Sequence, residues 1–219
     1  MIDRVIDAAR GAGAEAVTVV LGHDRAQVEG ALEARPDAAR LQVAEQAEQL
    51  GTGHAVWCAH EALAGGPDHT MILYGDVPNL SAEALASFWE AAQAHEGPLA
   101  VMTAALDDAT GYGRMVRAED GELVGIVEHA DATEALRAID EINTGIYLVE
   151  TDFLLTELEQ LCAGAADNAQ GEYYLTDLVA RAAEAGGALG WVLEDPAQIQ
   201  GVNTRADLAR AQAHALDPP

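Results

Sequence analysis

Asp76 and Asn203 occupy the positions in this sequence that best suit metal ligands. Asp76 closely follows the apolar run Thr70 to Tyr74, which predicts a buried strand. Ligands of open parallel sheets bind beyond the carboxyl ends of the strands, and a carboxylate there suits a hard cation such as Mg²⁺. Each residue also has a structural alternative, because Asp is a common turn former and Asn203, after Gly201, is suited to be a helix N-cap.

Two glycine-containing segments have the composition of ligand-binding loops. In the first, Gln46 to His54, Gly51 and Thr52 stand where a predicted strand gives way to a helix, and amides at a helix N-terminus attract anions. A plain capping turn is the simpler explanation of that pattern. The second, Gly111 to Arg114, combines two glycines with an aromatic ring and a guanidinium suited to a base, sugar or phosphate, and a tight turn is its alternative.

Glu128 is a carboxylate at the end of a predicted apolar strand. A buried carboxylate must find hydrogen-bond donors, and the hydroxyl groups of a sugar would supply them. Arg114 or Arg117 could equally be its partner. The sequence therefore leaves a sugar contact and an internal ion pair open.

Polar residues also interrupt the predicted core strand Ile142 to Val149. Asn143, Thr144 and Gly145 indicate either sugar recognition or a β-bulge. Glu172 to Tyr174 precede a predicted helix, where a staple and cap would suffice to explain them.

The elements that must position these residues alternate between helix and strand, which predicts an α/β fold with a mainly parallel sheet covered on both faces. A hairpin at 114–128 is expected as an insertion carried on this sheet. We expect one domain over residues 1–208 and a tail over 209–219. The expected strands are 16–21, 41–44, 70–74, 99–105, 142–149 and 188–193, and the expected helices are the first ten residues, 24–33, 52–63, 81–95, 152–161, 176–185 and a closing helix after Asn203.

Composition limits the partners. The 219 residues carry a formal net charge of -26, which argues against nucleic-acid and anionic-membrane binding. All eleven basic residues are arginine, so a phosphate site must be built from main-chain amides, a metal ion and a few arginines. Without an apolar run long enough for a membrane span or a signal peptide, we expect a soluble cytoplasmic protein. Cys58 and Cys162 are expected to be buried thiols.

The motifs together resemble a known family. The strings AEQLGTGHA, LYGDVP, GYGR, GIVEH, EINTGI, AQGEYYLTD and GVN occur in an order similar to the uridylyltransferase domain of the bifunctional bacterial N-acetylglucosamine-1-phosphate uridyltransferases, and the resemblance runs from Met1 to about Leu208. It implies a three-layer, Rossmann-like nucleotide-diphospho-sugar transferase fold. It also implies that UTP and N-acetylglucosamine 1-phosphate form UDP-N-acetylglucosamine and pyrophosphate, for peptidoglycan and cell-wall synthesis.

The resemblance assigns roles to single residues of this chain. It implies that Mg²⁺ is bound by Asp76 and Asn203, and it makes Arg114 a candidate catalytic residue. The implied contacts to uridine come from Gln46, Gly51 and Thr52, and those to the remainder of the nucleotide sugar from Tyr74, Gly113, Glu128, Asn143, Glu172 and Tyr174.

Two departures from the family pattern qualify this expectation. The family begins with a strand and a phosphate-binding loop of the form LAAGxGTRM, followed by a Pro-Lys pair. Neither the loop nor the Pro-Lys pair is found in these 219 residues. The hexapeptide-repeat acetyltransferase domain is not found in them either. We therefore expect a sheet without its first strand, and we expect UDP-N-acetylglucosamine to bind better than UTP. The uridylyltransferase rate should be at least about a thousandfold lower than that of a version that includes the strand and loop. The alternative is an impaired domain that binds a UDP-sugar or acts only as a non-enzymatic partner. Homo-oligomer formation stays open.

Overall fold

The computed structural model describes residues 1–216. The helices are α1 (Ile2–Gly11), α2 (Arg25–Glu33), α3 (Thr52–Trp57), α4 (His60–Leu63), α5 (Ala82–Gln93), α6 (Glu134–Arg137), α7 (Thr151–Ala163), α8 (Asp177–Glu184) and α9 (Arg205–Leu216), with 3₁₀ turns η1 (Ala38–Arg40) and η2 (Pro196–Ile199). The strands are β1 (Val17–Leu21), β2 (Leu41–Glu45), β3 (His69–Ile72), β4 (Leu99–Ala105), β5 (Arg114–Arg117), β6 (Leu123–Val127), β7 (Glu141–Glu150) and β8 (Ala188–Val192).

The main sheet is built around β7. Its strand order is β6-β5-β7-β4-β8, and β3 pairs with the second half of β7. Strands β3 and β4 run antiparallel to β7, whereas β8 runs parallel to β4. The predicted α/β class is confirmed, and the direction of β7 makes this sheet mixed. The expected hairpin forms β5 and β6 and joins the sheet edge.

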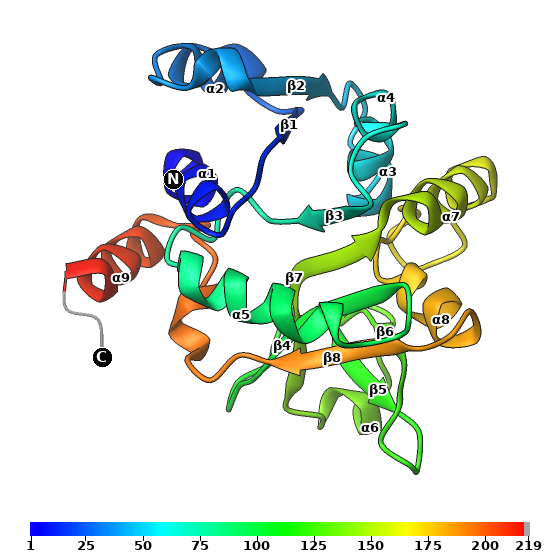
Figure 1. Ribbon diagram of the computed structural model, residues 1–219. Coiled ribbons are helices and arrows are strands. Elements are labelled where there is room, and N and C mark those ends of the chain that lie inside the picture. Colours follow the sequence, from blue (N-terminus) through cyan, green and yellow to red (C-terminus); the bar gives the residue numbers. More distant parts are fainter. Residues whose placement is uncertain (217–219) are drawn as a thin grey trace.

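Helices cover both faces of this sheet, which gives the expected three layers (Figure 1). On one face, Leu85 and Phe88 of α5 pack with Met102 and Ile146 in one apolar cluster. The second cluster, on the other face, joins α7 and α8 to β4 and β7. Ser81 caps α5 as predicted, since its Oγ accepts the Ala84 N–H at 3.1 Å.

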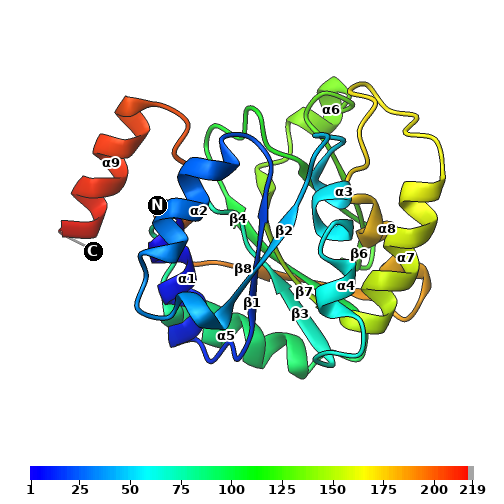
Figure 2. The same ribbon diagram turned by 90° about the horizontal axis from the view of Figure 1, so that it is seen from above.

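A second sheet contains only β1 and β2, which pair in parallel, and Figure 1 shows it apart from β3. Seen from above, in Figure 2, β1 and β2 lie over the main sheet. The core of this second sheet is small: Ile6, Val19, Leu21 and Leu32 are the buried members. Within residues 1–216 no strand lies between β1 and β3 and pairs with both. The two strand edges that we expect to be exposed without the family's first strand are therefore unpaired here.

The C-terminal helix is longer than the predicted domain boundary implies. α9 runs through position 208 to Leu216, and Ala211 is buried, with its carbonyl accepting from Asn79 Nδ2 at 3.0 Å. Part of the expected tail is therefore packed helix, and Asp217 to Pro219 lie outside the described residues.

Two further expectations concern burial and membranes. Cys58 and Cys162 are free thiols, but both are half-buried rather than buried as expected. None of the described helices combines the length and apolarity needed to cross a bilayer.

Candidate functional site

The loop between β2 and α3 is held in shape by side chains predicted to bind a ligand. Gln46 Nε2 donates to the Gly51 carbonyl at 3.0 Å and lies 3.2 Å from His54 Nδ1. Gly51 has a φ of 109°, and a Cβ there would lie 2.7 Å from the Tyr173 carbonyl oxygen, so only glycine fits without displacement. Thr52 Oγ1 accepts the Leu175 N–H at 3.0 Å.

Tyr74 connects this loop to β7. A Cβ added to Gly145, whose φ is 80°, would lie 2.5 Å from Tyr74 Cε2, so the tyrosine ring covers the space that a side chain would fill. Burial raises the pKa of Tyr74 to about 12, the carboxylates of Glu128 and Asp76 add to the rise, and a hydrogen bond with Thr52 opposes it. The ring therefore packs over Gly145 of β7, and the charges of Glu128 and Asp76 act on its hydroxyl.

Glu128 follows β6 and faces Thr176 rather than an arginine. Thr176 Oγ1 donates to Glu128 Oε1 at 3.1 Å. Burial raises the pKa of Glu128, and the nearby carboxylates of Asp131 and Asp177 act in the same direction. A Cβ at Gly113 would lie 2.9 Å from Ile126 Cγ2 and 3.3 Å from Glu128 Oε2, so a side chain there would crowd this carboxylate.

Asn143 lies in the interrupted part of β7. Its side chain is buried, and its Oδ1 accepts the Gly145 N–H at 2.9 Å. The register between β4 and β7 shifts here, between Val101 and Thr103. The structure therefore shows a β-bulge at this point, which leaves a sugar contact through the Asn143 amide group open as well.

Asp76 and Asn203 come together next to Gly201. A Cβ at Gly201 would lie 3.6 Å from both Asp76 Oδ2 and Asn203 Nδ2, and the Asp76 carbonyl accepts the Val202 N–H at 2.9 Å. A carboxylate and an amide are oxygen donors of the kind Mg²⁺ takes, and this ion keeps water and substrate phosphate as its other ligands. The pair therefore fits a magnesium ion, although the described residues contain no cluster of three or more His, Cys, Asp or Glu side chains suited to hold one.

Arg114 is placed differently from an arginine that meets substrate. It is 2% exposed, and its guanidinium donates to the carbonyls of Tyr112 and, at 3.4 Å, Arg137. Arg117 pairs with Glu141, with Nη2 at 2.7 Å from Oε1. Neither arginine is the partner of Glu128, and the predicted catalytic role of Arg114 gains no support from its position.

Glu172 and Tyr174 lie on the segment before α8. The Glu172 main chain exchanges two hydrogen bonds with the side chain of Asn168, at 2.6 and 3.1 Å. Tyr174 is buried, with its hydroxyl 3.2 Å from Asp131 Oδ2 and 2.9 Å from Gln170 Oε1. Burial and Asp131 raise its pKa to about 12. Both residues therefore shape the wall of the loop that covers Gly51.

Sequence reasoning missed two residues of this site. Thr176, the donor to Glu128, is part of the string AQGEYYLTD, so the motif contained it without revealing its partner. Tyr147, on β7, has a fully buried side chain, and burial together with the charges of Tyr74 and Glu128 raises its pKa. Its place in an apolar strand made it indistinguishable from a core residue.

Comparison with known proteins agrees with this arrangement. Residues 1–145 match the family of MobA-like NTP transferase domains. The chain belongs to this family. Its membership identifies a nucleotidyltransferase fold.

Individual relatives extend the match along the chain. The chain is 45% identical over 215 residues to the bifunctional protein GlmU of Sorangium cellulosum, a match that covers 97% of this chain and 45% of that protein. With the bifunctional protein GlmU of Cutibacterium acnes the identity is 43% over 220 residues, covering 97% and 51%. The resemblance to the bifunctional enzymes is confirmed, and the chain spans about half the length of these curated relatives.

Proposed function

We propose that this chain is a uridylyltransferase domain that forms UDP-N-acetylglucosamine and pyrophosphate from UTP and N-acetylglucosamine 1-phosphate. The observation that carries the proposal is that two adjacent residues join the proposed uracil and sugar contacts: the Leu175 N–H donates to Thr52 Oγ1 at 3.0 Å, and Thr176 Oγ1 donates to Glu128 Oε1 at 3.1 Å. Asp76 and Asn203, of the proposed metal contacts, come together beside Gly201. A single extended ligand with a base, a diphosphate and a sugar suits such an arrangement. The similarity to the bifunctional proteins GlmU supports a uridylyltransferase role.

In the proposed reaction, a phosphate oxygen of the sugar phosphate attacks the α-phosphorus of UTP, and the bond to the β-phosphate breaks to release pyrophosphate. No covalent intermediate with the protein is needed, so the residues act by position and charge. Asp76 and Asn203 would hold Mg²⁺, which offsets the charge of the phosphates when it is bound. Glu128 would accept hydrogen bonds from sugar hydroxyls, and Gln46, Gly51 and Thr52 would fix the uracil.

A panel of ligands tests the proposal. Calorimetry with residues 1–219 and Mg²⁺ should show UDP-N-acetylglucosamine binding more tightly than UDP-glucose, ADP-glucose or GDP-mannose. Pyrophosphate and UDP-N-acetylglucosamine should form from UTP and the sugar phosphate, and Asp76→Ala should reduce that rate by about 100-fold or more. Removal of the exposed carboxylate in Asp107→Ala is the control and should leave the rate unchanged.

Two outcomes would contradict the proposal. Equal affinity for nucleotide sugars of different bases would remove the uridine assignment, and equal affinity for UDP-glucose would remove the N-acetylglucosamine assignment. A purely non-enzymatic partner role, the alternative raised by the sequence, has no observation in its favour.

A further inference from the structure

The side-chain amide of Gln46 is held by two acceptors of its own loop. Its Nε2 lies 3.0 Å from the Gly51 carbonyl oxygen and 3.2 Å from Nδ1 of His54, a residue of α3 to which the family resemblance assigns no role. A carbonyl oxygen can only accept a hydrogen bond, so the end of the amide that faces it must be the NH₂ group. The Gly51 carbonyl therefore decides which way round the Gln46 amide lies.

The same NH₂ group determines the tautomer of the His54 ring. An amide NH₂ group donates and does not accept, so Nδ1 of His54 must be the acceptor and the ring proton must be on Nε2. That nitrogen lies 3.8 Å from Sγ of Cys58, directly after α3, and a thiol sulfur is a weak acceptor for its proton. The Gln46 amide, the His54 ring and the Cys58 thiol thus form one chain of hydrogen bonds with a single direction.

This arrangement uses both side-chain N–H groups of Gln46 and leaves its oxygen, Oε1, for a ligand. An acceptor in a fixed position matches a base whose ring carries an N–H. Uracil has such a donor at N3, whereas cytosine has an unprotonated nitrogen there. An amide held at two points has little freedom to turn away from that nitrogen, so the lone pairs of cytosine N3 and Oε1 would oppose each other.

We propose that His54 is a positioning residue that holds the Gln46 amide with its oxygen toward the base and thereby favours uracil over cytosine. The inference rests on the proposed function, in which Gln46 contacts uracil. His54 acts through Gln46, and its ring is supported by Tyr173, whose ring centroid lies 6.5 Å away. Without His54, only the Gly51 carbonyl would hold the amide. The amide could then swing away both from the uracil N–H and from the cytosine nitrogen, so the site would distinguish the two bases less well.

The binding test compares UDP with CDP by calorimetry in the presence of Mg²⁺. His54→Leu, which has no acceptor, should lower the ratio of UDP affinity to CDP affinity by about 3- to 10-fold, the effect of one net hydrogen bond. His54→Asn places a side-chain oxygen close to the position of Nδ1 and should keep the ratio near the wild-type value. A merely structural role would lower both affinities equally. His60→Leu, the same substitution at a ring stacked on Trp57, is the control and should leave both affinities unchanged.

The tautomer of His54 tests the inference without a ligand. Two-bond ¹H–¹⁵N spectra of the imidazole ring at about pH 8.5, where imidazole groups are neutral, should show the proton on Nε2. The inference is overturned by a proton on Nδ1, by an unchanged affinity ratio in His54→Leu, or by a ratio that is as low in His54→Asn as in His54→Leu. If the wild-type chain binds neither UDP nor CDP, the proposed function itself has failed and this inference falls with it.

Discussion

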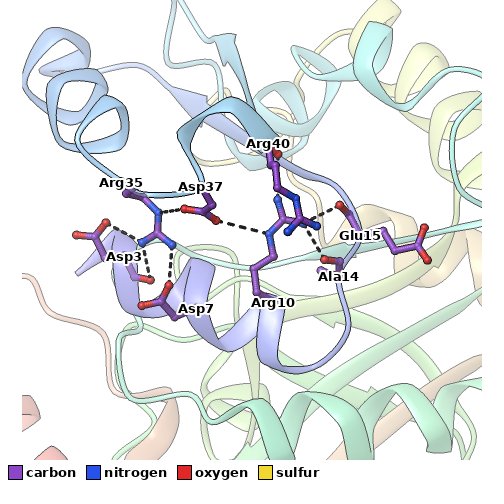
Figure 3. A network of polar contacts seen from close by, with 8 residues as sticks. All are labelled: Asp3, Asp7, Arg10, Ala14, Glu15, Arg35, Asp37 and Arg40. Atoms are coloured by element: carbon purple, nitrogen blue, oxygen red, sulfur yellow. Dashed lines mark hydrogen bonds and ion pairs between the residues drawn. The ribbon is translucent and has the colours of Figure 1, made fainter.

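The two sheets of the molecule are stabilised in different ways. The main sheet has an apolar cluster on each face, with side chains such as Leu85, Phe88 and Leu158 fully buried. The β1-β2 sheet has a small core, and ion pairs add to its stability. Figure 3 shows Arg35 between Asp3, Asp7 and Asp37, with Nη1 and Nε each 2.9 Å from a carboxylate oxygen.

Arg10 completes this polar network. Its guanidinium donates to the carbonyls of Ala14, Glu15 and Arg40 at 2.7–2.9 Å, which joins the end of α1 to the start of β2 (Figure 3). A cavity of about 680 Å³ opens beside it, but the cations Arg10 and Arg35 on its wall are already paired. We interpret this group as structural.

The proposed ligand site spans both regions. Gln46 follows β2 and its N–H donates to the Leu21 carbonyl at 2.8 Å, so the uracil side depends on the sheet with the small core. Glu128 and Asn143 belong to the main sheet. We therefore expect the part of the site that contacts the sugar to be rigid. The stability of the part that contacts the uracil should depend more strongly on salt, pH and substitution.

The largest expected effect is on the free energy of unfolding, and two glycine substitutions distinguish the cost of backbone strain from that of a steric clash. Gly145→Ala requires φ of 80° and places a Cβ against the Tyr74 ring, so it should lower the free energy of unfolding by about 2–4 kcal/mol and weaken UDP-sugar binding. Gly13 also has a positive φ, 101°, but open space around its Cβ position. Gly13→Ala should therefore lower it by only about 1 kcal/mol. Chemical denaturation measures both, and equal losses would show that the Tyr74 contact is not tight.

A middle-sized effect is expected in the polar network. Arg35→Met leaves three aspartates without their shared cation, so amide hydrogen exchange in β1 and β2 should become about tenfold faster while that of β7 is unchanged. Arg25→Met removes more exposed pairs with Glu29 and Glu45 and should change exchange by less than about threefold. If Arg35→Met made amide hydrogen exchange faster in both sheets, the result would contradict the expectation that the two sheets are stabilised independently.

The smallest expected effect is a contrast in pH dependence. Burial raises the pKa of Glu128, so its charged form destabilises the fold as the pH rises through the folded-state value. Glu128→Gln should raise the melting temperature by about 2–4 °C at pH 7 and have no effect below about pH 4. The bond with Arg35 lowers the pKa of Asp37, so the stability from this pair is present above the unfolded value of 3.8 and is lost as the pH falls further. Thermal unfolding across pH 3–7 measures the effect of Glu128→Gln on the melting temperature. A higher melting temperature of this variant at low pH would contradict the expectation.

Local patterns predicted most of the fold. The apolar runs identified strands such as β4, and Ser81 identified the start of α5. The ligand contacts assigned to Asp76 and Glu128 stay predictions. The antiparallel direction of β7 was not predictable, because it depends on which strands pair across long stretches of chain.

Site contacts were predicted less completely for the same reason. Thr176 meets Glu128 across 48 positions of sequence, and Tyr147 lies in an apolar strand, where the sequence pattern is that of a core residue. Arg114 belongs to a segment with the composition of a ligand-binding loop. It is buried instead, and its guanidinium donates to the main-chain carbonyls of Tyr112 and Arg137.

Amide NMR of the ¹⁵N-labelled chain during titration with UDP-N-acetylglucosamine and Mg²⁺ tests the central claim most directly. The account predicts that the largest shift changes occur at Thr52, Asn143 and Gly201, with little change at Arg10 and Arg35. Changes centred on α1 and η1 instead, or no saturable change at the strand ends, would contradict the assignment of the nucleotide-sugar site to this edge of the sheet.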